Sequence, residues 1–256
     1  MYDLQKKNWV RFSYRDWYAY FKRNDARRLK IDFSNEKVLT DAERALILPS
    51  VRAFQKGEHS EGFQFLELAK KFAADRNRPL YTDAISLFIK EENFHSAYLA
   101  QFMTHYEMQM ERENVLDKVF RFLRHKGGLF TEIAVLVTAE IIALTYYSAL
   151  GNVADRIGSP ALRSVCNQML HDELPHIVFQ SYTLSHFSDS FFVRLFRKVL
   201  MEGTTAFVYA FYGKVIKAGG YGYGKFRKEN MGYLHQSMDM IENMKKDTAR
   251  ENVLDK

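Results

Sequence analysis

Two four-residue stretches decide the fold of this chain: Glu92-Asn93-Phe94-His95 and Glu173-Leu174-Pro175-His176. Each is a Glu-x-x-His inside a long segment with helical periodicity. At positions i and i+3 of a helix, a carboxylate and an imidazole project from the same face. Two such helices that face each other, with one more Glu from each of two other helices, form a cage of four carboxylates and two imidazoles for two metal ions. The paired stretches therefore predict a di-metal site inside an all-α bundle.

Composition supports a single helical domain. The chain has 256 residues, of which 47% are hydrophobic, so it can bury a sizeable core. Only four prolines and 13 glycines interrupt it, which favours long helices over many short strands. The single cysteine, Cys166, excludes an internal disulfide and suits a reducing cytoplasm. The first residues contain no long apolar run, so we expect no signal peptide.

Charge and hydropathy argue against two classes of partner. The formal charge is +6, but the basic residues are spread along the chain, which indicates a solvated surface rather than a nucleic-acid footprint. Residues 133–150 form the most membrane-like stretch, and Glu140 interrupts it. A buried bundle helix that carries a metal ligand explains this stretch better than a membrane span. The 21 Phe and 15 Tyr residues suit a large apolar interior with room for a substrate.

The hydrophobic pattern predicts four core helices within residues 50–185, with peripheral helices in 1–49 and 186–256. Thr40 and Glu43 form a capping box that starts a helix, and Pro49 is expected to kink or interrupt it. We expect the first core helix to run unbroken from Ser50 to about Phe72. The other core helices are expected at 83–106, 130–150 and 161–185, a polar helix at 112–124, and two further helices after residue 190.

The apolar stripes of the core helices contain the acids and histidines of the predicted metal site. The predicted ligands are Glu61, Glu92, His95, Glu140, Glu173 and His176. Because Glu92 and Glu173 belong to the paired stretches, they are the predicted bridging and catalytic carboxylates. Fe and Mn ions suit such a mixed carboxylate and imidazole set, and the set does not separate an Fe/Fe pair from a Mn/Fe pair.

One position in this set has a close competitor. The first two core helices should form a hairpin, so two ligands that face each other should lie at similar distances from its turn. At a rise of about 1.5 Å per residue, Thr82 to Glu92 spans roughly 15 Å and Glu61 to Asp75 roughly 21 Å, and the turn takes up part of the difference. This hairpin count favours Glu61 over Glu58, which then lies beside the metals or shifts onto one. Glu132 competes with Glu140, but an acid near a helix start often only complements the helix dipole.

Other residues are expected to support the ligands. Ligating histidines usually donate their second N–H to a carboxylate. We predict that Asp172 holds His95 and that Glu91 holds His176, the alternative being that both acids face solvent. Tyr147 lies on the face of Glu140, as a redox-active or hydrogen-bonding group or, by default, as a packed core tyrosine. Pro175 is expected to kink the fourth core helix at the metal site.

The paired stretches resemble the ferritin-like di-iron carboxylate superfamily. This includes ribonucleotide reductase small subunits, bacterial multicomponent monooxygenases, acyl-carrier-protein desaturases, the p-aminobenzoate N-oxygenase group and uncharacterised bacterial ferritin-like proteins. The resemblance covers about residues 57–180 and is carried by 57–62, 137–143, 146–150 and 172–180. It implies a ferritin-like four-helix bundle with extra helices at both ends, and a di-iron or Mn/Fe centre that reacts with O2. The N-oxygenases carry a third histidine where this chain has Met169, and Pro175 is also unusual for the superfamily.

The leading functional hypothesis is an oxidase or oxygenase that uses O2 to oxidise a small apolar or aromatic molecule, with an unidentified electron donor. The long aromatic helices after the core favour it over simple iron handling. Alternatives are a ferroxidase, iron-storage or peroxide-scavenging protein, and a structural or binding protein with a vestigial site. The apolar periphery is compatible with a homodimer by fold analogy.

Overall fold

The computed structural model describes residues 1–6, 8–59, 62–110 and 128–254, and the side chains of α9 as far as residue 246. Within these ranges the ordered elements are all helical, as the sequence predicts. The elements are η1 (Leu4–Lys6), η2 (Asn8–Arg11), α1 (Tyr14–Asp25), α2 (Asp41–Glu58), α3 (Phe63–Asp75), α4 (Pro79–His105), α6 (Leu129–Ile157), α7 (Pro160–Leu184), α8 (Phe191–Ala218) and α9 (Tyr223–Leu254). The polar helix expected at 112–124 falls outside the described residues.

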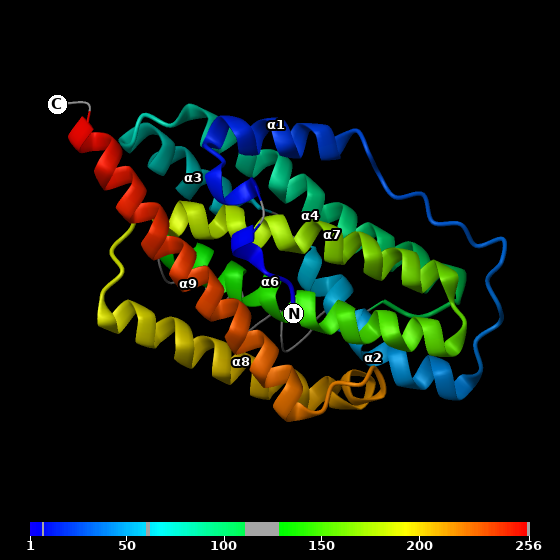
Figure 1. Cartoon of the computed structure of the whole chain (residues 1–256). Coiled ribbons are helices and arrows are strands. Elements are labelled where there is room, and N and C mark those ends of the chain that lie inside the picture. The colour runs from blue at the N-terminus through cyan, green and yellow to red at the C-terminus, as the bar shows by residue number, and fades with distance from the viewer. Residues whose placement is uncertain (7, 60–61, 111–127, 255–256) are drawn as a thin grey trace.

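A core of α2, α4, α6 and α7 forms the bundle, with α3 continuing the line of α2 after a break. The most extensive packing in the molecule joins α6 to α7, and α4 contacts α1, α2 and α3 (Figure 1). On the opposite side, α8 and α9 pack on each other and cover α6 and α7. The fold is therefore the ferritin-like bundle with added terminal helices that the sequence predicts.

The N-terminal segment closes one side of the bundle. Ser13 caps α1 through a capping box with Asp16, and α1 buries Trp17 and Phe21 against α4 and α7. Trp17 lies 5.3 Å, between ring centroids, from Phe179 on α7. A peripheral helix within residues 1–49 is present, as expected, and it forms an aromatic wall over the motif-bearing helices.

The predicted unbroken first core helix is wrong. The helix that Thr40 caps continues through Pro49 and ends at Glu58, and α3 begins only at Phe63. Gly62 sits between them with φ 65°, and a Cβ there would lie 2.6 Å from Ile89 Cγ2. Glycine is the residue that tolerates both this backbone conformation and this close approach. The hairpin count that favours Glu61 assumed an unbroken helix, so it does not apply.

The most apolar helix is also the most buried. By length and composition α6 could cross a membrane, but 89% of its most apolar window is buried inside the protein. It carries Glu140 with a side chain that is 3% exposed. This agrees with the predicted buried bundle helix.

Candidate metal centre

The two Glu-x-x-His stretches face each other across the bundle. Glu92 and His95 come from α4, and Glu173 and His176 come from α7. Both imidazoles are fully buried, and their ring centroids lie 5.7 Å apart. The helix α7 runs through Pro175 without interruption, so the proline does not displace His176 from the Glu173 face.

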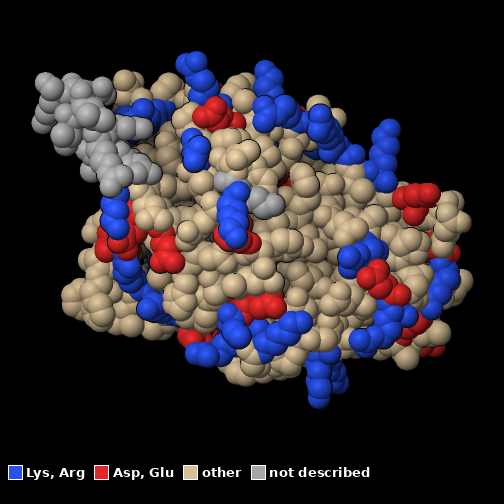
Figure 2. All heavy atoms as spheres, in the orientation of Figure 1, with Lys and Arg blue, Asp and Glu red and all other residues tan. Residues whose placement is uncertain are grey.

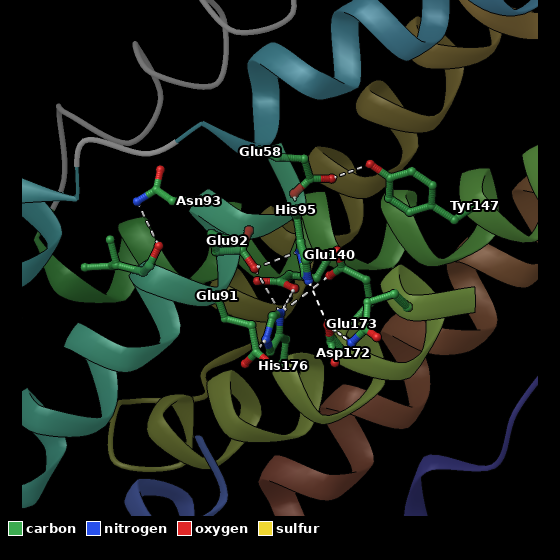
Figure 3. A network of polar contacts seen from close by, with 12 residues as sticks. Glu58, Glu91, Glu92, Asn93, His95, Glu140, Tyr147, Asp172, Glu173 and His176 are labelled. Carbon is green, nitrogen blue, oxygen red and sulfur yellow. Dashed lines mark hydrogen bonds and ion pairs between the residues drawn. The ribbon is translucent and has the colours of Figure 1, made fainter. Parts of the chain in front are cut away.

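Two further carboxylates come from the other core helices. Glu58, the last residue of α2, places Oε2 3.9 Å from His95 Nδ1. Glu140, in the middle of α6, places Oε2 3.1 Å from His176 Nδ1. Each of the four core helices therefore directs at least one acid into a shared interior point (Figure 3).

The donor atoms divide into two groups that share members. Glu58, Glu92, His95 and Glu173 offer atoms that all lie within 4.8 Å of one another. The same holds for Glu92, Glu140, Glu173 and His176. Only Glu92 and Glu173 belong to both groups, which is the arrangement that two adjacent metal ions with two bridging carboxylates require.

Both histidines turn Nδ1 toward this interior. His95 Nδ1 lies 3.6 Å from Glu92 Oε1 and 3.6 Å from Glu173 Oε1. His176 Nδ1 lies 3.0 Å from Glu92 Oε1 and 3.7 Å from Glu173 Oε2. An imidazole nitrogen amid carboxylate oxygens is a suitable metal ligand.

The outer nitrogens of the histidines meet the acids that precede the motif glutamates. His95 Nε2 donates to Asp172 Oδ2 at 3.1 Å, and His176 Nε2 donates to Glu91 Oε2 at 3.3 Å. Both contacts that the sequence predicts are present. They hold the proton on Nε2, so that Nδ1 faces the donor cluster and can bind a metal ion in place of its own proton.

Two residues that the sequence analysis did not identify hold these acids in turn. Gln168 donates to Asp172 Oδ2 at 2.7 Å from one turn earlier on α7. Asn24 on α1 donates to Glu91 Oε1 at 3.0 Å. Helical spacing could have indicated Gln168. Asn24 reaches Glu91 only through the packing of α1 on α4, for which the sequence gives no local signal.

Tyr147 contacts the cluster through Glu58. Its hydroxyl donates to Glu58 Oε1 at 2.7 Å, and the phenol is fully buried (Figure 3). Tyr147 is therefore both a packed core tyrosine and a hydrogen-bonding one. The contact fixes one carboxylate oxygen of Glu58 and leaves the other directed at His95.

Burial and mutual repulsion raise the pKa values of acids in the cluster. Burial, followed by the charge of Glu140, raises the pKa of Glu173 to about 8. Burial, followed by the charges of Glu173 and Glu92, raises the pKa of Glu58 well above its usual value. Acids gathered in a dry interior hold protons unless a cation replaces those protons.

For His95, the neighbouring acids have a larger effect on the pKa than burial has. Burial lowers the pKa of His95, but the hydrogen bond to Asp172 and the charge of Glu92 outweigh it and raise the pKa to about 10. For Asp172, burial acts to raise the pKa, yet the hydrogen bonds with His171 and His95 hold it far below its usual value. The site therefore favours positive charge at its centre and a permanent negative charge at Asp172.

Several interior atoms of the cluster have no hydrogen-bond partner within the part of the chain that the structure describes. They are Glu92 Oε1, His95 Nδ1, Glu140 Oε1 and both carboxylate oxygens of Glu173. Leaving such an atom buried and unpaired costs about 1–3 kcal/mol. A pair of divalent cations would satisfy all of them, so the residues present fit a di-metal centre.

The remaining candidates lie elsewhere. Glu61 falls outside the described residues. Glu132 is buried in the first turn of α6 and belongs to neither donor group. Met169, which stands where the N-oxygenases carry a third histidine, is packed in the core.

A pocket at the surface reaches the outer side of the centre. Its lining includes Asn24, Glu91, His95, Gln168 and Asp172, together with charged residues at the end of α1. Of the two acids that hold the histidines, the side chain of Glu91 is 14% exposed and that of Asp172 only 3%.

A scan against protein-family models and a search of curated proteins gave no match. A search of solved structures matched an R2-like ligand-binding oxidase with an aerobically reconstituted Mn/Fe cofactor, at a TM-score of 0.67 and 17% identity over 91% of this chain and 93% of that one. A point mutant of an R2-like ligand-binding oxidase with an anaerobically reconstituted Mn/Fe cofactor matches at a TM-score of 0.68 and 17% identity, over 91% and 94% of the two chains. At this identity the similarity shows the fold, which is ferritin-like.

Proposed function

We propose that this protein binds two metal ions, Fe/Fe or Mn/Fe, and uses them with O2 to oxidise or oxygenate a small organic molecule. The observation that carries the proposal is the pair of buried donor groups that share Glu92 and Glu173. Solved proteins of the same fold, at low identity, are named as oxidases that carry Mn/Fe cofactors, which supports this choice of metals.

The proposed ligands are Glu58, Glu92, His95, Glu140, Glu173 and His176. Glu58 replaces Glu61 in this set because it shares a donor group with His95 and is held by Tyr147. One ion would lie among Glu58, His95 and the two shared carboxylates, and the other among Glu140, His176 and the same two. Such a pair would supply redox electrons and Lewis acidity for the reduction of O2.

The chain's own residues prepare this site in two ways. Asp172 and Glu91 accept the Nε2 protons, so each ring is already oriented with Nδ1 toward the cluster, where a metal ion would displace the Nδ1 proton. Aromatic rings exclude water next to His176: its ring centroid lies 4.7 Å from Phe88 and 5.9 Å from Phe21. A dry apolar wall beside an oxidising centre suits an apolar or aromatic substrate.

The proposed compartment rests on the cysteine content, and the proposed partners rest on the site. A lone buried Cys166 with a pKa raised by burial suits a reducing cytoplasm. The proposed partners are O2, an apolar small molecule and an electron donor of unknown identity.

The test is O2 consumption by metal-loaded protein, with Glu92→Ala and His176→Ala as site variants. We expect the wild type to consume O2 and both variants to lose bound metal and O2 uptake together. Uptake that continues for many turnovers with iron alone would instead support a ferroxidase. Unchanged metal content in both variants would overturn the assignment of the site.

A further inference from the structure

Although basic residues occur along the whole chain, one short segment carries most of their excess. Residues 22–30, at the end of α1 and directly after it, contain five basic residues and one acid, against a formal charge of +6 for the entire chain. We call this segment the basic patch. Figure 2 shows Lys and Arg side chains along the edge of the molecule that α1 forms in Figure 1. The basic residues of the patch are Lys22, Arg23, Arg27, Arg28 and Lys30, and all but Arg28 are exposed.

Most of these cations are not neutralised by acids of the described chain. The one acid of the patch, Asp25, already has two cationic neighbours. Arg23, Arg27 and Lys30 form no ion pair with any residue that the structure describes. Like charges gathered in this way repel one another, and an acidic partner would relieve that repulsion. The patch is therefore complementary to an anionic surface.

The basic patch borders the surface pocket on the outer side of the proposed metal centre. Arg27 and Arg28 line this pocket together with His95 and Asp172. The guanidinium of Arg28 lies over the ring of Phe94, 3.2 Å from its centroid, which holds this positive charge at the pocket wall. A partner that binds the patch would therefore sit above a proposed metal ligand.

A short chain of hydrogen bonds joins the same surface to the second histidine. Asn24, inside the patch, donates to Glu91 at 3.0 Å, and Glu91 accepts from His176 at 3.3 Å. Electrons tunnel through proteins fastest along short paths of covalent and hydrogen bonds. The basic patch lies at the outer end of such a path, and the proposed ligand His176 lies at its inner end.

The proposed reaction consumes electrons that the substrate does not supply. When O2 oxygenates an organic molecule, one oxygen atom enters the substrate and the other leaves as water. This balance takes up two electrons and two protons from outside. A reduced iron–sulfur or flavin protein supplies such electrons and is itself oxidised.

We propose that the basic patch is the docking surface for a small acidic redox protein, of the iron–sulfur or flavin class, that reduces the metal centre. The inference rests on the proposed function and names the class of its electron donor. Complementary charge steers an encounter of this kind and raises the association rate by about 10–10³-fold at low salt. A nucleic acid would also match the charge, but it has no use for a pocket that reaches a metal ligand.

Binding is measured first, by titrating the full-length, metal-loaded protein with an acidic ferredoxin and, separately, with a flavodoxin, both oxidised. We expect the affinity to fall at least about tenfold between about 20 mM and about 300 mM ionic strength, because salt screens exposed charges. The double variant Arg27→Glu/Lys30→Glu should lose at least about tenfold in affinity at low salt.

The matched control is Lys214→Glu/Lys217→Glu. It makes the same change of net charge at exposed lysines of α8, which lies along the opposite edge of the molecule from α1 (Figure 1). This variant should bind both donors as the wild type does.

Reduction is measured next, by following the absorbance of the ferric protein after mixing with reduced ferredoxin or flavodoxin. Arg27→Glu/Lys30→Glu should slow this reduction at least about tenfold, with no change in metal content or in reduction by dithionite, which needs no docking surface.

The outcomes separate this inference from the proposed function. Protein that holds no metal, or that dithionite does not reduce, would overturn both. Intact metal with equal binding and equal reduction rates in the two double variants would overturn the docking surface alone. A wild type that binds neither donor would do the same, as would substitutions in the patch that abolish only the binding of DNA or anionic vesicles.

Discussion

Tyr147 on α6 donates a 2.7 Å hydrogen bond to Glu58 at the end of α2. This contact links a buried phenol to the carboxylate at the point where the first core helix stops. The other oxygen of Glu58 faces His95 at 3.9 Å. The relationship places Glu58 among the proposed ligands.

The first prediction separates the two candidate acids of this region. Glu58→Ala should remove one ligand and lower affinity for the ion beside His95 by at least about tenfold, because each such ligand contributes strongly to affinity. Glu61→Ala should keep the wild-type metal content. Titration with Fe(II) or Mn(II) under anaerobic conditions measures both. The reverse pattern would restore Glu61 as the ligand.

The second prediction concerns the acid behind His95. Asp172→Asn should weaken metal binding by about 10–100-fold, since an amide orients His95 less firmly and adds no negative charge. Glu67→Gln is the matched control, because Glu67 is exposed and pairs with the exposed Lys70. Equal metal affinity in Asp172→Asn and Glu67→Gln would remove Asp172 from the site.

The third prediction is a pH dependence of the metal-free protein. The pKa values of Glu173 and His95 are raised to about 8 and about 10, so the folded state holds more protons than the unfolded state between their ordinary and raised pKa values. The stability that these groups provide is present below their unfolded pKa values and is lost as pH rises. The Tm of metal-free protein should therefore fall between about pH 6 and about pH 9.

Bound metal should suppress this fall, because cations then neutralise the same acids. Calorimetry of the metal-free and metal-loaded protein across that range makes the comparison. A metal-free Tm that rises with pH would contradict the proposed proton occupancy.

The fourth prediction tests the break between α2 and α3. Gly62→Ala should lower the free energy of unfolding by about 1–3 kcal/mol, because φ is positive and the new Cβ would press on Ile89. Gly57→Ala is the control: it lies inside α2 with open space around it, so it should be neutral or stabilising by up to about 1 kcal/mol. Urea unfolding of both variants gives the values. Equal effects would show that the turn does not depend on Gly62.

Much of this architecture could be predicted from the sequence because its signals are local. The spacing from Glu92 to His95 and from Glu173 to His176 predicted the two facing helices. The same spacing predicted which acid contacts which histidine, since Asp172 and Glu91 occupy equivalent positions before each motif.

The errors arose where tertiary contacts decide the outcome. The stripe from Val51 to Phe72 has helical spacing throughout, yet the close approach of Ile89 and the left-handed Gly62 break it into two helices. Pro49 was expected to kink or interrupt a helix, and α2 is not interrupted there. Asn24 reaches Glu91 only because α1 packs on α4, which no local pattern reports.

The most direct test of a di-metal centre is elemental analysis of protein purified from cells supplied with iron and manganese, followed by an absorption spectrum after Fe(II) and O2 are added. The six proposed ligands predict about two metal ions per chain and the band of an oxo-bridged ferric pair. Protein without bound metal that shows no spectral change with Fe(II) and O2 would contradict the proposal. The six residues would then be a buried polar network without a cofactor.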